Sequence, residues 1–236
     1  MSGASKPHPP GSSFPDAVIL DLDGTMWDAT WAVAEAWAPL VAEAAREFPT
    51  LPPVTQPAIM GVMGMAHQQI GETLFGAVPP ARRETLLRAC YEAEARHITR
   101  TPPPLYPGVA AALRTMQPIL PLFIVSNCQR GYIEAFLAGT GLGGVFRDIE
   151  CHGDTGLSKA ANLGLLARRN GLARPWYVGD TQGDMDAAHG AGFAFVHAAY
   201  GFGRVSGPAP AIHGLEELPP MLAQARQVAG TVQGDL

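Results

Sequence analysis

Two carboxylates, two residues apart, end the first apolar stretch of the chain. Asp21 and Asp23 follow residues 17–20, a run of the length and composition expected of a short buried strand. Side chains at alternate positions of a strand point the same way, so the two carboxylates can converge on one point. Buried like charges repel unless a cation or a shared proton compensates them. The pair therefore predicts a reactive or cation-binding strand end. The alternative is a strand that stops at a solvated Asp-Gly turn.

Other polar side chains follow other predicted strands in the same way. Ser126 and Asn127 come directly after the second predicted strand, and Asp180 and Asp184 follow a later one. The carboxyl ends of parallel strands lie along one edge of a sheet, so these side chains can meet the first pair there. Carboxylates from two strands favour Mg²⁺, a hard cation that prefers oxygen ligands.

Lys159 stands at the beginning of a predicted helix and is unusual in this chain. The sequence contains 2 lysines and 14 arginines, so a lysine at this point is conspicuous, although chance explains a single count equally well. A lysine ammonium, a serine hydroxyl and helix N-terminal N–H groups are the donors that phosphate oxygens need.

An alternation of strands and helices would position these residues. It predicts an α/β fold with a Rossmann-like parallel sheet and helices on both faces. The predicted strands cover residues 17–20, 122–125, 146–151, 176–178 and 193–196, and the predicted helices of this part cover 108–116, 130–138, 159–169, 183–189 and 215–227.

The alternation is interrupted after the first strand. Apolar residues at spacings of three and four predict helices over 27–48, 57–63, 66–76 and 80–99, with no strand among them. We therefore expect an all-helical cap, residues 27–103, inserted into a catalytic core formed by 16–26 and 104–236. Residues 1–15 are polar and rich in Pro, Gly and Ser, which predicts a disordered leader.

These motifs resemble the haloacid dehalogenase-like superfamily, in particular its phosphatases with a helical cap. Asp21-Leu22-Asp23-Gly24-Thr25 resembles the first motif, Ile124-Val125-Ser126-Asn127 the second, Lys159 the third, and Val178-Gly179-Asp180-Thr181-Gln182-Gly183-Asp184 the fourth. Segments 106–109 and 193–201 are similar to the phosphoglycolate phosphatase-like subgroup. The chain departs from the family in having Ala160 after the lysine, where proline is frequent.

The resemblance implies a role for each of these residues. Asp21 would be the nucleophile, and Asp23 the general acid and base. Mg²⁺ would be held by the Asp21 carboxylate, the Asp23 backbone carbonyl and Asp180, with Asp184 bound directly or through water. The phosphoryl group would be bound by Ser126 and Lys159, with Gly24, Thr25 and Asn127 lining the phosphate pocket.

The expected activity is Mg²⁺-dependent hydrolysis of a small phosphomonoester, phosphoglycolate-like or a sugar or nucleotide phosphate, through an aspartyl-phosphate. The acid at Asp23 separates this reaction from dehalogenases, which usually lack it. Two alternatives remain open. A phosphomutase of the β-phosphoglucomutase type keeps both aspartates. A non-catalytic signalling module also uses a phosphorylated aspartate, but it places that residue on a later strand and needs about half this length.

Composition limits the partners and the compartment. The net charge of −5 argues against nucleic acid and anionic membranes, and no apolar stretch is long enough to span a bilayer. Three widely spaced cysteines favour a reducing, cytoplasmic setting over a disulfide framework. We expect a monomer or homodimer that acts on a small phosphorylated metabolite.

Overall fold

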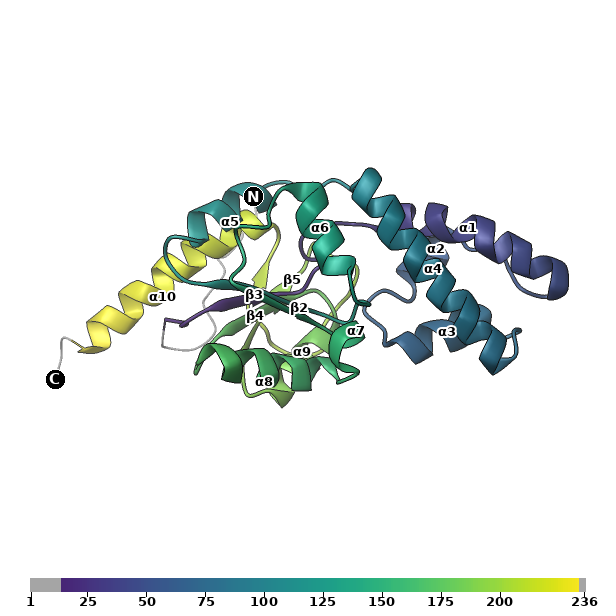
Figure 1. The fold of residues 1–236 in the computed structure, drawn as a ribbon. Helices are drawn as coiled ribbons and strands as arrows, with labels where there is room; N and C mark the ends of the chain where they lie inside the picture. Colours follow the sequence, from purple (N-terminus) through teal and green to yellow (C-terminus); the bar gives the residue numbers. More distant parts are fainter. Residues whose placement is uncertain (1–13, 234–236) are drawn as a thin grey trace, which may run out of the picture.

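The structure, a computed structural model, describes residues 14–233 and is built around a six-stranded parallel sheet (Figure 1). The strand order is β3-β2-β1-β4-β5-β6, the order of doubly wound Rossmann-type sheets, and it confirms the predicted fold class. The order reverses between β1 and β4, and ligands of such sheets bind outside the strand ends at that point. The strands are β1 (Val18–Leu20), β2 (Leu122–Ser126), β3 (Asp148–Cys151), β4 (Trp176–Gly179), β5 (Ala194–Ala198) and β6 (Ala211–Ile212).

Helices cover both faces of the sheet, because alternate residues of its central strands are apolar on both sides. Val18 and Leu20 of β1 pack on one face, toward α5, α6 and α10, whereas Ile19 packs on the other, toward α8 and α9. The helices of this part are α5 (Val109–Met116), α6 (Tyr132–Thr140), α7 (His152–Thr155), α8 (Lys159–Asn170), α9 (Gln182–Gly190) and α10 (Leu218–Gln233).

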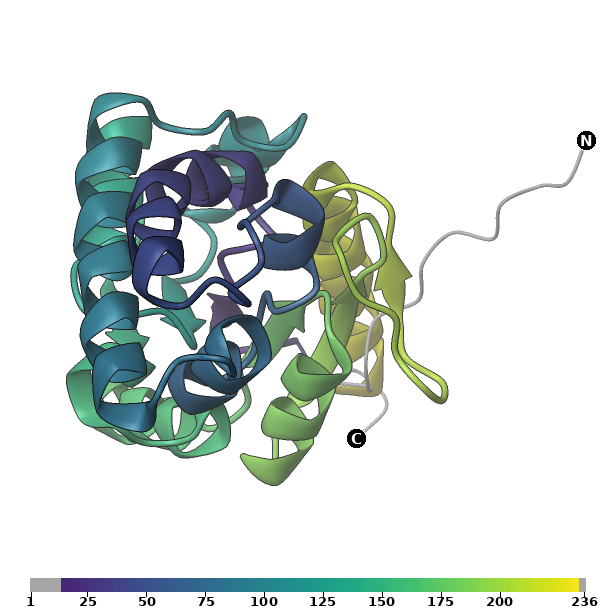
Figure 2. The same cartoon turned by 90° about the vertical axis from the view of Figure 1, so that its right-hand side faces the viewer.

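Five helices and no strand separate β1 from β2, as the sequence predicts, and the first four of them form the insertion. These four are α1 (Thr30–Glu47), α2 (Gln56–Met60), α3 (His67–Phe75) and α4 (Pro80–Arg100). They form a layer at one end of the sheet, and Figure 2 shows them from that end. The first begins at Thr30 and not at the predicted residue 27, because Trp27 instead forms an isolated bridge with Leu105, where the chain returns from the insertion.

The sequence did not predict α7 or β6. Each has four residues or fewer, which is too short to show a periodicity. Of the predicted disordered leader, residues 1–13 lie outside the described part of the chain, and Phe14 packs against the core. Within residues 14–233, no helix is long and apolar enough to cross a membrane.

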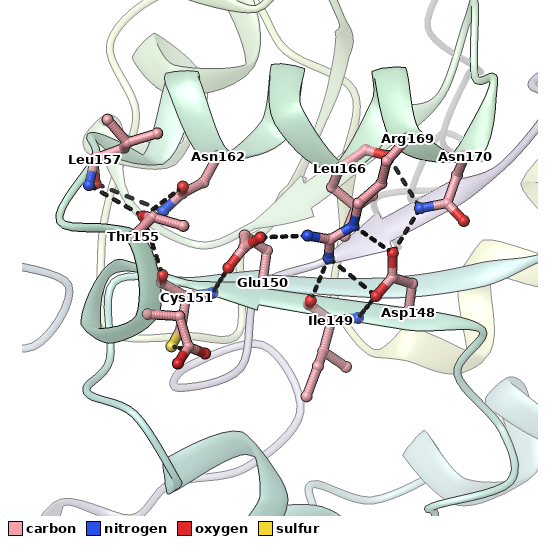
Figure 3. A network of polar contacts seen from close by, with 11 residues as sticks. Asp148, Ile149, Glu150, Cys151, Thr155, Leu157, Asn162, Leu166, Arg169 and Asn170 are labelled. Atoms are coloured by element: carbon pink, nitrogen blue, oxygen red, sulfur yellow. Dashed lines mark hydrogen bonds and ion pairs between the residues drawn. The ribbon is translucent and has the colours of Figure 1, made fainter.

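Arg169 anchors α8, the helix that begins with Lys159, to the edge strand β3 (Figure 3). Its guanidinium donates to both carboxylate oxygens of Asp148, at 2.6 and 2.9 Å, and to Glu150 at 2.5 Å. It also donates to the backbone carbonyl of Ile149. Planar recognition of this kind is specific to arginine, so this clamp fixes the position of α8 against the sheet.

Candidate active site

The structure brings the three predicted acidic residues Asp21, Asp180 and Asp184 together. One oxygen of each carboxylate lies within 4.8 Å of the others, and all three residues are buried. Asp21 follows β1 and Asp180 follows β4, the two strands at the reversal of the sheet order, while Asp184 lies in the first turn of α9. Burial, opposed by Lys159 and reinforced by Asp184 and Asp180, raises the pKa of Asp21 well above its usual value.

Lys159 supplies the positive charge of this cluster. Its Nζ lies 3.0 Å from Asp21 Oδ1 and 2.5 Å from Asp184 Oδ1. Burial alone would lower the pKa of this lysine, but the two carboxylates outweigh burial and hold its pKa above the usual value. The ammonium is therefore charged at neutral pH. With all three carboxylates ionised, the cluster carries two more negative than positive charges.

Asp184 accepts four hydrogen bonds. Lys159 and the Tyr177 hydroxyl donate to Oδ1, while the backbone N–H and hydroxyl of Thr181 donate to Oδ2 at 2.9 and 2.7 Å. Thr181 and Asp184 thus form a capping box at the start of α9. Burial alone would raise the pKa of Asp184, but the charge of Lys159 and these bonds hold it below the usual value.

Asp180 has one carboxylate oxygen without a partner. Oδ2 accepts from the backbone N–H groups of Phe202 at 2.7 Å and Gly203 at 3.2 Å. Oδ1 is buried and has no hydrogen-bond partner among the described residues. Burial and the nearby Asp184 raise the pKa of Asp180 to about 6. Asp180 Oδ1 lies beside two further carboxylates, in a cluster with excess negative charge. This arrangement fits a divalent cation that prefers oxygen ligands, such as Mg²⁺.

Two glycines let the backbone approach the Asp180 carboxylate. Gly24 has φ +79°, and a Cβ there would lie 2.6 Å from Asp180 Cγ. A Cβ on Gly201 would lie 2.6 Å from Asp180 Oδ2. Side chains are therefore excluded at both positions, and Gly24 is further required by its left-handed backbone.

Asp23 lies apart from the cluster and is held by neutral donors. Its Oδ1 accepts from the Trp27 indole N–H at 2.9 Å and from the Tyr132 hydroxyl at 2.8 Å. No described side chain donates to Oδ2. Burial raises the pKa of Asp23 to about 7, against the effect of these two hydrogen bonds. A carboxyl with a pKa near neutrality can both donate and accept a proton at neutral pH.

The remaining predicted residues divide into two groups. Ser126 and Asn127 line the same cavity as Asp21, and Asn127 also donates to the Gly64 carbonyl at 2.9 Å, which ties the inserted segment to the sheet edge. Gly24 and Thr25 do not line this cavity. Gly24 packs against Asp180, and Thr25 is fully buried, with no hydrogen-bond partner for its Oγ1 in the described part of the chain.

The cavity lies between the sheet edge and the inserted helices and has a volume of about 580 Å³, including its open mouth. Its floor carries the polar residues, and its other walls are mostly apolar and aromatic. The lining residues are Asp21, Asp23, Val33, Trp37, Ile59, Val62, Met63, Gly64, Met65, Ile70, Tyr91, Glu94, Ser126, Asn127, Cys128, Gln129, Tyr132 and Lys159.

The sequence did not predict Tyr132 or Glu94 as part of the site. Tyr132 lies 109 positions from the Asp23 that it contacts, and no local pattern marks such a pair. The position of Glu94 in the sequence does indicate burial, because it shares the buried stripe of α4 with Leu87, Cys90 and Ile98. A carboxylate at an apolar spacing of a helix needs a buried partner.

Known proteins resemble this chain in sequence and structure. The family model described as haloacid dehalogenase-like hydrolase matches residues 15–192. A phosphoglycolate phosphatase from Synechococcus elongatus is 32% identical over 197 residues, which cover 79% of this chain and 84% of that protein. One from Pseudomonas syringae pv. syringae is 29% identical over 196 residues, 80% of this chain and 71% of that protein.

A solved structure shares the fold. The crystal structure of a predicted phosphoglycolate phosphatase from Haemophilus somnus 129PT superposes with a TM-score of 0.75 at 19% identity, over 89% of this chain and 99% of that one. The chain therefore belongs to the haloacid dehalogenase-like hydrolases. Within that family it is similar to phosphoglycolate phosphatases, so the family resemblance and the expectation of an enzyme are confirmed.

Proposed function

We propose that this protein is a Mg²⁺-dependent phosphatase that hydrolyses a small phosphomonoester through an aspartyl-phosphate on Asp21. The observation that carries the proposal is the contrast between its two neighbouring carboxylates. Asp21 lies 3.0 Å from the Lys159 ammonium, whereas Asp23 accepts side-chain hydrogen bonds, within residues 14–233, only from the neutral Trp27 and Tyr132. Different surroundings of two adjacent acids assign different roles to them.

Asp21 is the nucleophile in this scheme. Lys159 holds its Oδ1, and the free oxygen attacks phosphorus as the bond to the leaving oxygen breaks. Asp23 gives its proton to that leaving oxygen. It then removes a proton from the water that hydrolyses the aspartyl-phosphate, and inorganic phosphate leaves.

Bound Mg²⁺ would supply the positive charge that lets an anionic carboxylate approach an anionic phosphate. The residues that would hold it are Asp21, Asp180 and the backbone carbonyl of Asp23. Asp184 already accepts four hydrogen bonds, so we assign it to a water ligand of the ion and to holding Lys159.

Ser126 and Asn127 would bind the phosphoryl oxygens. The Ser126 Oγ accepts from the Cys128 backbone N–H, which leaves the hydroxyl proton free to donate to phosphate. We further propose that residues 27–103 act as the cap that excludes water, supported by the contact of Asn127 with Gly64.

The test is release of phosphate from p-nitrophenyl phosphate in the presence of Mg²⁺. Asp21→Asn should abolish release, since an amide is a far weaker nucleophile. Asp186→Asn is the matched control, because Asp186 is an exposed aspartate in the same helix as Asp184. Absence of release from any phosphomonoester, with the wild-type protein folded and Mg²⁺ present, would refute the proposal.

A further inference from the structure

The walls of the cavity opposite the carboxylate cluster are almost entirely apolar. They come from the inserted helices and the loop between two of them. Their side chains are hydrocarbon or thioether except for the Trp37 indole, whose N–H is donated to Glu94, and Tyr91 of α4 adds a phenol beside them. The residues are Val33, Trp37, Ile59, Val62, Met63 and Ile70. Such walls fit the body of an organic leaving group better than a second charged group.

One acid, Glu94, stands in these walls and is 4% exposed. Its Oε2 accepts from the Trp37 indole N–H at 2.7 Å, and its Oε1 accepts from the Gln129 side-chain amide at 2.8 Å. Both partners are neutral. Burial raises the pKa of Glu94 to about 8, which agrees with the absence of a compensating cation beside it among the described residues.

No basic side chain of the described residues is free to receive an anion in this cavity. Lys159 is the only basic residue in its lining, and its ammonium is bound to Asp21 and Asp184. Of the basic residues on the neighbouring helices, His67, Arg82 and Arg96 pair with Glu84, Glu47 and Glu92, and Arg83, Arg88 and Arg100 do not line this cavity.

These observations restrict the leaving group of the proposed phosphatase reaction. Once Glu94 is ionised, above its pKa of about 8, a carboxylate there would be desolvated beside a second carboxylate and without a cation, which is strongly unfavourable. A hydroxyl or ammonium group would instead donate to Glu94, which retains unused lone pairs.

We propose that Glu94 determines specificity by selecting phosphomonoesters whose leaving group carries a hydrogen-bond donor, hydroxyl or ammonium, and by rejecting those that carry a carboxylate. This inference rests on the proposed phosphatase function and names its substrate class. It sets the chain apart from its named relatives, since phosphoglycolate carries a carboxylate on a two-carbon leaving group.

The experiment compares three phosphomonoesters with the same two-carbon skeleton: 2-phosphoglycolate, 2-hydroxyethyl phosphate and phosphoethanolamine. At a pH of about 9, where Glu94 is ionised, we expect kcat/KM to be at least about tenfold lower for phosphoglycolate than for either of the others. In Glu94→Gln, the ratio of phosphoethanolamine to phosphoglycolate kcat/KM should fall by about tenfold, mainly through KM. Because the ratio is taken within one preparation, loss of folded protein cancels.

Glu92→Gln is the control, since Glu92 is an exposed glutamate two positions away on the same helix. Its ratio should equal that of the wild type. Phosphoglycolate hydrolysed as well as or better than the other two would overturn the specificity inference alone. An unchanged ratio in Glu94→Gln would also overturn it. No release from any ester, p-nitrophenyl phosphate included, would overturn the phosphatase function itself.

Discussion

Two ionic clusters lie at the two ends of this molecule's α8, and they are built differently. At its C-terminal end, Arg169 donates to Asp148, Glu150 and a backbone carbonyl, so each charged oxygen that it faces has a donor (Figure 3). At its N-terminal end, Lys159 faces three buried carboxylates, and Asp180 Oδ1 has no hydrogen-bond partner among residues 14–233.

The difference separates a structural cluster from a reactive one. The Arg169 cluster is partly exposed and nearly balanced in charge. It can therefore stabilise the fold without a bound ion. The Lys159 cluster is buried, has excess negative charge and includes one acceptor oxygen that no described residue contacts with a donor. Such an arrangement costs stability unless something else completes it, as is typical of functional sites.

Removal of the buried cation should have the largest effect on stability. Lys159→Met leaves three acids without a counter-charge, and we expect the free energy of unfolding to fall by about 3–5 kcal/mol in EDTA. Added Mg²⁺ should restore part of the loss. Urea unfolding at neutral pH measures the free energy of unfolding in EDTA and in Mg²⁺. A loss below about 1 kcal/mol in EDTA would mean that the carboxylates do not repel one another strongly in the absence of Lys159.

Removal of the Arg169 guanidinium should have a smaller effect. Arg169→Ala leaves the buried Glu150 unpaired, and we expect a loss of about 1–2 kcal/mol that Mg²⁺ does not restore. Its kcat/KM for p-nitrophenyl phosphate should stay within about twofold of the wild type. Arg168→Ala is the control, because this exposed neighbour forms no ion pair with the described residues.

The pH dependence of stability should have opposite signs in the two clusters. Burial alone would raise the pKa of Asp148, but hydrogen bonds from Arg169 and Asn170 hold it below the usual value. Its stabilisation is therefore present above the unfolded pKa and is lost as pH falls through the folded pKa. Asp180, with a pKa raised to about 6, shows the opposite sign: stability is present below the unfolded pKa and is lost as pH rises toward 6.

Thermal unfolding in EDTA, repeated across the pH range of these two titrations, measures how the stability contributed by Asp180 and by Asp148 changes with pH. The stability of the wild type relative to Asp180→Asn should decline as pH rises from about 4 to 6. Relative to Asp148→Asn it should decline only as pH falls below about 4. If the stability of the wild type relative to both variants changed with pH in the same direction, the distinction between the two clusters would be contradicted.

Local patterns in the sequence predicted most of this architecture, and long-range contacts supplied the rest. Asp21 is predictable because an apolar strand precedes it, and Lys159 because it opens a helix with apolar periodicity. Glu94 and Tyr132 enter the site through partners 35 and 109 positions away, and the pairing of Arg169 with β3 depends on the packing of α8 against that strand. Spacing within one element carries no information on such pairs.

If a divalent cation completes the Lys159 cluster, thermal unfolding with and without Mg²⁺ detects it without reference to activity. Saturating Mg²⁺, at about 100 times its Kd, should stabilise the wild type by about 2.7 kcal/mol, a rise in Tm of several degrees. Arg169→Ala should keep this rise, and Asp180→Asn should lose most of it. An equal rise in Asp180→Asn and the wild type, or no rise in the wild type at any Mg²⁺ concentration, would show that no divalent cation completes this cluster.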